Sequence, residues 1–308
     1  MACPCGRTTN SRLDWVHHTT HGWLLTLHIA VAIIITLMAL LSPDFLECVV
    51  ALGTPSDEEK SIWIASGFLF GRFIQKVDEQ TSRYRVVLVS NRHVFLGLEW
   101  LTMRFNPEEG QQASEFRVAL NENGKQRWFS HPDENIDVAV LPISTDTLRQ
   151  HKIKFNFFRS NNQSADLAKL EKLGISEGDG VFVLGFPMGI VGTQRSYVIV
   201  RGGNIARIRD CIAGSSSDFL IDAPVFPGNS GSPVILRPEI ASIEGTEAVS
   251  ESYLIGIVKS YIPYQDIAIS PQTKRQRVVF EENSGLASVE PVDHIQKTIE
   301  SIQPVELE

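Results

Sequence analysis

The sequence predicts an all-β fold made of many short strands. Apolar segments alternate with polar turns from about residue 46 onward, and this pattern is typical of paired β-barrels or of a β-sandwich. With 308 residues, 43% of them hydrophobic, the chain is long enough for one large two-lobed domain. In the first half the expected strands are Cys48–Leu52, Ile62–Phe70, Arg85–Ser90, Leu101–Phe105, Phe116–Leu120 and Val138–Leu141. In the second half they are Val181–Leu184, Tyr197–Ile208, Phe219–Asp222, Pro233–Leu236, Leu254–Ser260, Val278–Phe280 and Leu286–Val289.

Two helices are expected among these strands. Ser164–Leu173 falls between the two halves of the strand pattern. Pro291–Gln303 is expected to close the domain, since proline is favoured in the first turn of a helix and apolar residues recur on one face. Those apolar residues are Val292, Ile295, Ile299 and Ile302.

An apolar segment at the N-terminus predicts one transmembrane helix ahead of the β-domain. Residues 22–41 carry no formal charge and are mostly Leu, Ile, Val and Ala, and that length spans a bilayer core. A secretory signal is usually shorter, and no A-x-A cleavage site follows. Secretion after cleavage of a signal peptide is the alternative.

The charges that flank this segment predict its orientation. Arg7 and Arg12 precede it, whereas acidic residues such as Asp44 and Glu47 follow it. The positive-inside rule therefore places residues 1–21 in the cytoplasm as an N-terminal tail. The domain that follows is expected in the periplasm or outside the cell, anchored to the membrane through residues 22–41.

Charge and cysteine content exclude several other functions. The net charge is −8 and there is no sustained basic stripe, which argues against nucleic acid as a partner. Cys3-Pro-Cys5 has the wrong spacing, and too few companion ligands, for a zinc site. No metal and no other cofactor are expected. Cys48 and Cys211 could pair in an oxidising compartment, a point that the sequence leaves open.

Three residues in the chain order His93, Asp137, Ser230 suit the chemistry of a serine hydrolase. A serine hydroxyl is a weak nucleophile, so it needs a base to take its proton and a third group to hold that base. An imidazole ordinarily titrates near neutral pH, and His93 can be that base. Asp137 can accept a hydrogen bond from the other ring nitrogen. Each of the three residues lies beside an expected strand.

The glycines around Ser230 suit a second requirement of that chemistry. Ser230 lies in the segment Gly228-Asn-Ser-Gly-Ser-Pro233. The tetrahedral intermediate of acyl transfer carries an oxyanion, and two backbone N–H groups must point at it. The concave turn that achieves this needs backbone angles that glycine adopts without strain. Gly228 and Ser230 are the expected N–H donors of this oxyanion hole.

Five blocks of the sequence carry a recognisable family pattern. They are Ile64-Ala-Ser-Gly-Phe-Leu-Phe70, Ser90-Asn-Arg-His-Val94, Asp137-Val-Ala-Val-Leu141, Gly180-Val-Phe-Val-Leu-Gly-Phe-Pro-Met-Gly189 and Ile221-Asp-Ala-Pro-Val-Phe-Pro-Gly-Asn-Ser-Gly231. These blocks resemble the trypsin-like serine proteases of the chymotrypsin fold, on the Deg/HtrA side of that superfamily. Two departures from the family pattern, Ser232 in place of glycine and Phe226 in place of asparagine, bear on substrate preference.

This resemblance implies a trypsin-like domain over residues 46–303, made of two six-stranded antiparallel β-barrels and a C-terminal helix. It implies a serine endopeptidase that acts on proteins or peptides. It does not extend to a PDZ domain, which many Deg-type relatives carry.

The resemblance also indicates the substrate pocket. The residue six positions before the nucleophile, Pro224, is expected at its base, and Val258, Lys259 and Ser260 are expected along its wall. Pro224 offers no carboxylate, so cleavage after Lys or Arg is not expected. Val258 stands where glutamate-specific relatives place a histidine, and an apolar pocket is therefore expected.

Two other classes of function compete with the protease. One is a catalytically silent, protease-like module that binds other proteins. The presence of all three triad residues argues against it. The other is a non-peptidase acyl hydrolase, but such enzymes mostly use the order Ser, Asp, His on an α/β sheet.

Overall fold

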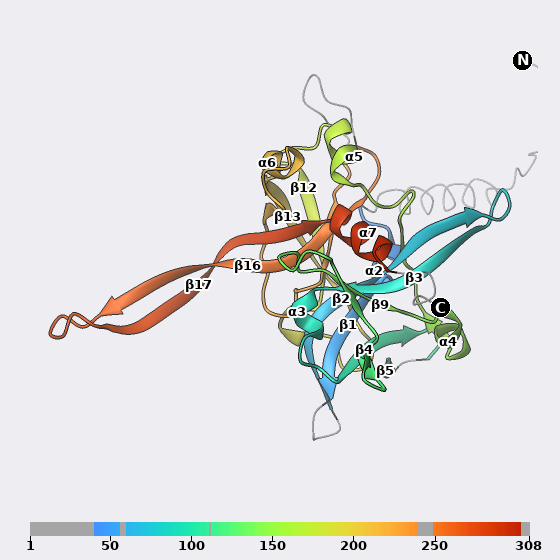
Figure 1. The fold of residues 1–308 in the computed structure, drawn as a ribbon, viewed down its shortest axis with the longest axis horizontal. Coiled ribbons are helices and arrows are strands. Elements are labelled where there is room, and N and C mark those ends of the chain that lie inside the picture. The colour runs from blue at the N-terminus through green and yellow to red at the C-terminus, as the bar shows by residue number, and fades with distance from the viewer. Residues whose placement is uncertain (1–39, 56–59, 111, 240–248, 303–308) are drawn as a thin grey trace, which may run out of the picture. The chain divides into compact units, whose positions relative to one another are not determined.

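The computed structural model describes residues 40–302, apart from 56–59, 111 and 240–248 (Figure 1). The chain divides into two units, Met1–Ala39 and Leu40–Glu308, and all described residues belong to the second. The expected cytoplasmic tail and transmembrane segment therefore lie outside the described residues, except for Leu40 and Leu41. Within the described part, no helix is both long and apolar enough to cross a bilayer.

The first lobe is an open sheet of nine strands in the order β10-β4-β1-β2-β3-β9-β8, with β5 beside β4 and β11 parallel to β2. The prediction of a closed six-stranded barrel is wrong for this lobe. Its outermost strands, β8 and β10, have only two residues each and do not pair with one another. The strands are β1 Val49–Pro55, β2 Ser61–Lys76, β3 Ser82–Ser90, β4 Trp100–Pro107, β5 Ser114–Ala119, β8 Phe129–Ser130, β9 Ala139–Pro142, β10 Ile153–Lys154 and β11 Phe158–Arg159. A two-stranded hairpin of β6 Asn121–Glu122 and β7 Lys125–Gln126 lies apart from this sheet.

The second lobe is the closed six-stranded antiparallel barrel that was predicted. Its strand order is β12-β13-β14-β17-β16-β15. Side chains that alternate along these strands fill the interior, among them Val181, Ile221 and Val289. The strands are β12 Gly180–Gly185, β13 Ile199–Arg207, β14 Phe219–Asp222, β15 Pro233–Leu236, β16 Leu254–Ile269 and β17 Gln276–Pro291.

A shared apolar cluster joins the two lobes. It contains Phe68 of β2, Leu184 of β12 and Ile257 of β16, all fully buried. The closing helix α7 (Val292–Glu300) packs Ile295 and Ile299 into the same cluster. The predicted C-terminal helix and its buried face are therefore confirmed, although the helix ends at Glu300 rather than at residue 303.

The five other helices in the described part of the chain are short. The predicted helix 164–173 is confirmed in part as α5 (Leu167–Lys172), which begins after Asp166 because that side chain caps the N–H of Lys169 at 2.8 Å. A 3-10 turn, η1 (Pro187–Gly189), follows β12. The remaining helices are α2 Pro43–Leu46, α3 Arg92–Phe95, α4 Thr145–Gln150 and α6 Arg209–Ile212.

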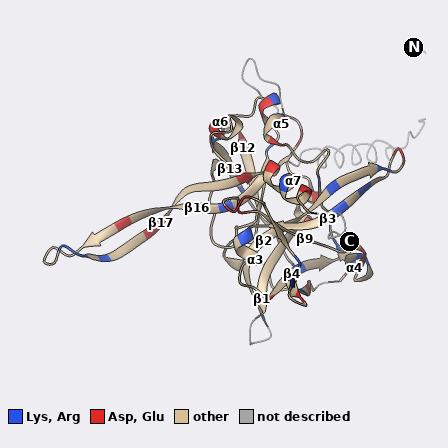
Figure 2. Ribbon diagram, viewed as in Figure 1, with Lys and Arg blue, Asp and Glu red and all other residues tan. Residues whose placement is uncertain are grey.

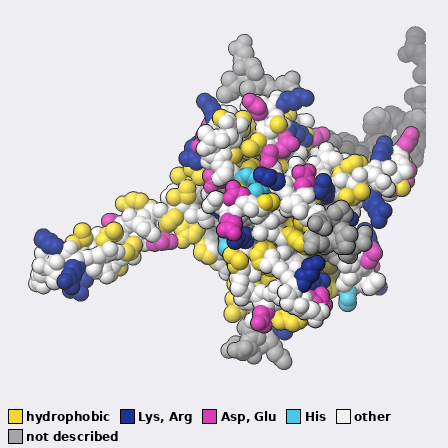
Figure 3. Space-filling model, viewed as in Figure 1, with side chains coloured by type: hydrophobic (Ala, Val, Ile, Leu, Met, Phe, Trp, Pro, Cys, Tyr) yellow, Lys and Arg dark blue, Asp and Glu magenta, His cyan; other side chains and the backbone are white. Residues whose placement is uncertain are grey.

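Strands β16 and β17 continue past the barrel as a long two-stranded hairpin (Figure 1). The predicted break between Val278–Phe280 and Leu286–Val289 is wrong, because both lie in the single strand β17. The outer part of the hairpin exposes apolar side chains, which appear in yellow in Figure 3. They are Tyr264, Ile267, Ile269, Val278, Val279 and Phe280.

Cys48 and Cys211 are both free and buried. They belong to separate apolar clusters, one between the lobes and one inside the barrel. Burial raises the pKa of the Cys211 thiol to about 12. The structure therefore leaves them unpaired.

Candidate active site

The short helix α3 presents His93 at the surface of the first lobe. Its neighbours Val94 and Phe95 are buried in the core of that lobe, and Phe95 stacks on Trp128 with ring centroids 5.4 Å apart. These two anchors leave the imidazole on the outer side of the helix, where 49% of the side chain is exposed. Asp137 lies just ahead of β9 between the buried residues Ile136 and Val138.

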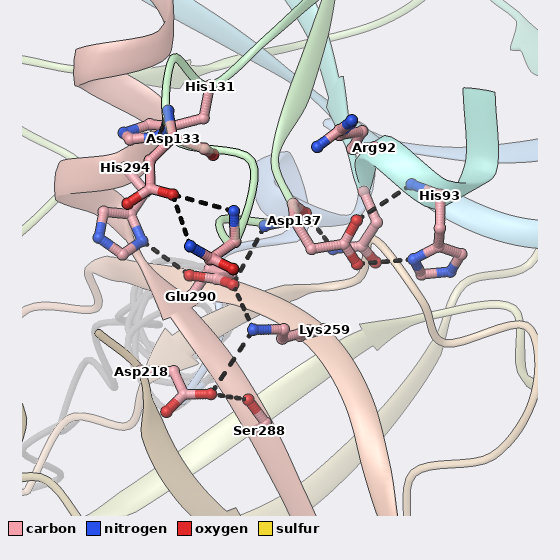
Figure 4. Close-up of polar contacts among 12 residues, drawn as sticks. Arg92, His93, His131, Asp133, Asp137, Asp218, Lys259, Ser288, Glu290 and His294 are labelled. Atoms are coloured by element: carbon pink, nitrogen blue, oxygen red, sulfur yellow. Dashed lines mark hydrogen bonds and ion pairs between the residues drawn. The ribbon is translucent and has the colours of Figure 1, made fainter. Parts of the chain in front are cut away.

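His93 and Asp137 are joined by two hydrogen bonds (Figure 4). The imidazole Nδ1 lies 2.6 Å from Asp137 Oδ2, and the backbone N–H of His93 donates to Oδ1 at 3.0 Å. An ionised carboxylate can only accept, so Nδ1 carries the ring proton in this pair. The Nε2 atom is then the free basic nitrogen, as a general base requires.

The backbone of Asp137 is held from both sides. Its carbonyl accepts the side-chain N–H of Asn91 at 2.8 Å, and its N–H donates to Glu290 Oε1 at 3.2 Å. Asn91 precedes α3 in the first lobe, whereas Glu290 lies on β17 of the barrel. Both lobes therefore fix the residue that orients His93.

Ser230 lies in a tight turn between β14 and β15. The turn contains Gly228 with φ +96° and Gly231 with φ +82°, a backbone conformation that favours glycine. Asn229 ties the turn together, since its N–H donates to the carbonyl of Phe226 at 2.9 Å and its side chain accepts from the N–H of Phe226 at 3.1 Å. In the described part of the chain, the N–H groups of Gly228 and Ser230 donate to no acceptor. These are the two N–H groups that were expected to form an oxyanion hole.

Ser66 of β2 fastens this turn to the first lobe. Its N–H donates to the carbonyl of Ser230 at 2.9 Å, and its hydroxyl donates to the carbonyl of Gly228 at 2.8 Å. The same hydroxyl accepts the N–H of Phe186 at 2.9 Å. This role of Ser66 was not predicted from the sequence, where Ser66 stands out only as part of a block that matches the family. A lone serine among the buried apolar residues of an expected strand was the available signal.

Ser90 brings the serine turn close to the helix that carries His93. The Ser90 hydroxyl donates to the carbonyl of Ser66 at 2.8 Å, and Ser90 ends β3 just ahead of α3. A side chain on Gly231 would clash with both serines.

Within the described residues, however, the Ser230 hydroxyl and His93 Nε2 form no hydrogen bond with each other. Such catalytic contacts often form only when substrate is bound.

The expected pocket residues lie in three environments. Pro224 and Ser260 are exposed, whereas Val258 is fully buried, and its carbonyl accepts the N–H of Gly231 at 3.0 Å. The ammonium of Lys259 lies 2.9 Å from Glu290 Oε1 and 3.8 Å from Asp218 Oδ2. Its positive charge is therefore already paired.

The described residues contain no group of three or more His, Cys, Asp and Glu that could hold a metal ion. A hollow of about 1020 Å³ lies in the first lobe, but the residues that line it include none of the triad. Basic and acidic residues are intermingled over the described elements (Figure 2).

Comparison with protein families matches residues 65–238 to the trypsin-like peptidase domain. The match covers more than half of the 308 residues, and it contains His93, Asp137 and Ser230. The chain belongs to the trypsin-like peptidase family. A comparison with curated proteins found no match. The family is one of serine proteases. Their chemistry needs a base, a group that orients the base, and a nucleophilic serine.

Proposed function

We propose that this trypsin-like peptidase is a serine endopeptidase in which His93, Asp137 and Ser230 form the catalytic triad. The observation that carries the proposal is the pair of hydrogen bonds from His93 to Asp137, which leaves Nε2 free to act as the base. Ser230 is the nucleophile, and its hydroxyl is bound to no other group in the described residues.

The reaction proceeds through an acyl-enzyme. His93 Nε2 takes the proton of Ser230 as its oxygen attacks the peptide carbonyl, and Asp137 stabilises the imidazolium. The free N–H groups of Gly228 and Ser230 stabilise the oxyanion. His93 then gives its proton to the leaving amine. Water hydrolyses the ester in a second round of the same steps.

Substrate preference follows from the charges near the expected pocket. Lys259 is paired with Glu290 and Asp218, so it offers no free positive charge to an acidic side chain. Pro224 offers no negative charge to a basic one. The proposed substrates are proteins or peptides with small or medium aliphatic residues at the cleavage site.

We also propose a cellular location and a subfamily for the protein. A transmembrane helix over residues 22–41 would anchor the protease with its domain in the periplasm or outside the cell, and secretion after cleavage is the alternative. Within its family, the chain is proposed to be closest to the Deg/HtrA proteases.

The test of the membrane anchor is a carbonate wash of membranes that hold the full chain, which should leave the protein in the pellet. Soluble protein that begins after Leu41 would establish the alternative.

The test of the triad is labelling with a fluorophosphonate probe, followed by digestion of casein. Wild-type protein should be labelled and should cleave casein. Ser230→Ala should do neither yet keep its melting temperature, because the lost hydroxyl makes no hydrogen bond within the described residues. Ser217→Ala, at an exposed serine whose hydroxyl makes no hydrogen bond within the described residues, is the control and should behave as wild type. Labelling without casein or peptide cleavage would indicate an acyl hydrolase, and neither would indicate a silent binding module.

A further inference from the structure

A buried carboxylate lies directly behind the proposed triad. Glu290 is fully buried near the end of β17, and a charged group in such a place is costly unless it is paired. Its Oε1 receives the N–H of Asp137 at 3.2 Å and the ammonium of Lys259 at 2.9 Å. Its Oε2 lies 2.7 Å from Nδ1 of His294 on α7. Glu290 thus links the first lobe, the barrel and the closing helix (Figure 4).

The bond to Asp137 fixes the backbone from which the Asp137 side chain starts. The carboxylate of Asp137 must meet two N–H groups of His93 at once. A small rotation of the Asp137 backbone would therefore turn the imidazole. Of the two bonds that hold this backbone, the one from Asn91 comes from within the first lobe and the one to Glu290 comes from the barrel.

Lys259 makes a second carboxylate tolerable next to Asp137. Neighbouring like charges repel each other. The ammonium of Lys259 offsets this repulsion, since it pairs with Glu290 and Asp218 and is also attracted by the charge of Asp137. Ser288 holds Asp218 in place through a 2.5 Å hydrogen bond. Burial acts to lower the pKa of Lys259, but the hydrogen bond to Glu290 and the nearby carboxylates outweigh it and raise that pKa. Burial likewise acts to raise the pKa of Glu290, and its bonds to His294 and Lys259 outweigh it and lower that pKa. Both groups are therefore charged at neutral pH.

We propose that Glu290, held by Lys259 and His294, is a positioning residue that sets the orientation of Asp137 and through it that of His93. The barrel and the closing helix would in this way control the base of the first lobe. This inference rests on the proposed function for its kinetic consequence, but its structural content can be measured without any turnover.

The test compares Glu290→Gln with Glu177→Gln in the full chain. Glu177 is a matched control because its carboxylate also accepts backbone N–H groups, from Ile208 and Arg209, and also pairs with a cation, Arg209 at 2.8 Å. It makes no contact with Asp137 in the described residues. The first readout is the proton resonance of His93 Nδ1–H, recorded in a Ser230→Ala background. The second is kcat and KM for a peptide substrate in the chains that keep Ser230.

Glu290→Gln should shift or broaden the His93 resonance. It should lower kcat by about 10- to 100-fold, because a small misplacement of a catalytic group has an effect of that size. KM should change by less than about threefold, since substrate binding does not depend on the orientation of His93. Glu177→Gln should change neither. A folded Glu290→Gln with an unchanged resonance and unchanged kcat overturns the proposal. If wild-type protein cleaves no peptide, the proposed function fails, and the resonance alone decides the positioning role. If Glu290→Gln does not fold, the double variant Lys259→Met with Glu290→Gln removes the ion pair as a whole and is judged by the same two readouts.

Discussion

Replacing Gly228 by alanine should damage both the stability and the proposed chemistry of the serine turn. Gly228 has φ +96°, and a Cβ atom there would lie 2.5 Å from the carbonyl oxygen of Phe186 and 2.9 Å from the nitrogen of Met188. Real Cβ atoms essentially never approach backbone that closely. Something must therefore shift in the alanine variant, and the atoms in the way belong to backbone that cannot rotate aside.

The size of the effect has two parts. The positive φ costs an alanine about 1–2 kcal/mol. The displaced atoms both take part in hydrogen bonds, from Met188 N–H to the carbonyl of Pro227 at 2.6 Å and from Gly189 N–H to the carbonyl of Phe186 at 3.1 Å. Weakening each costs about 0.5–1.5 kcal/mol. The variant should therefore lose about 2–5 kcal/mol in total.

Gly178→Ala separates these two parts. Gly178 has nearly the same φ, +100°, but no atom lies within 4 Å of its Cβ position. It should lose only the backbone part, about 1–2 kcal/mol. The free energy of unfolding of both variants should be measured by urea denaturation, and fluorophosphonate labelling should fall for Gly228→Ala alone. Equal losses of stability in the two variants would refute the contact argument.

Two further changes test other parts of the site, and a third tests a carboxylate away from it. Asp137→Asn should keep the fold but lower kcat by roughly 10⁴-fold in a peptide assay, because His93 would be held in the wrong tautomer; a loss under tenfold would contradict that role. Ser66→Ala should lower the free energy of unfolding by about 2–4 kcal/mol, since it leaves the buried carbonyl of Gly228 and N–H of Phe186 without partners; unchanged urea denaturation would count against it. Hydrogen bonds from backbone N–H groups, above all that of Ile208, lower the pKa of Glu177 from 4.5 to about 2. The ionised carboxylate therefore stabilises the fold above pH 4.5, and this contribution is lost as the pH falls toward 2. The stability advantage of wild type over Glu177→Gln should therefore shrink between pH 5 and pH 2, and an advantage independent of pH would disprove the assignment.

The barrel strands could be predicted because the sequence encodes them locally. Phe219–Asp222 and Pro233–Leu236 were predicted with the bounds that the structure has, since each is a short apolar run between turn residues. The candidate triad could also be predicted from the sequence, because His93, Asp137 and Ser230 each lie in a short block with a distinctive composition. The structure places His93 beside Asp137, and within the described residues the N–H groups of Gly228 and Ser230 donate to no acceptor.

The first lobe and the long hairpin could not be predicted in the same way. Whether a sheet closes depends on its edges, and the edge strands β8 and β10 are only two residues long. The outer part of β16 and β17 has no buried face, so the apolar alternation that marks a half-buried strand is absent. Apolar residues occur on both strands there, for example Ile267 opposite Val279.

The contacts that complete the site cross between lobes, and no local pattern encodes them. Ser66 reaches the turn of Ser230 from 164 residues away in sequence, and Glu290 reaches Asp137 from 153 residues away. Neither lobe alone holds both the proposed base, His93, and the proposed oxyanion-hole donors. Each lobe instead holds a part of the site that belongs to the other. Ser66 of the first lobe holds the serine turn of the barrel, and Glu290 of the barrel holds Asp137 of the first lobe. The site should therefore form only when the lobes dock, and conditions that loosen the shared core around Phe68 should abolish fluorophosphonate labelling before either lobe loses its strands.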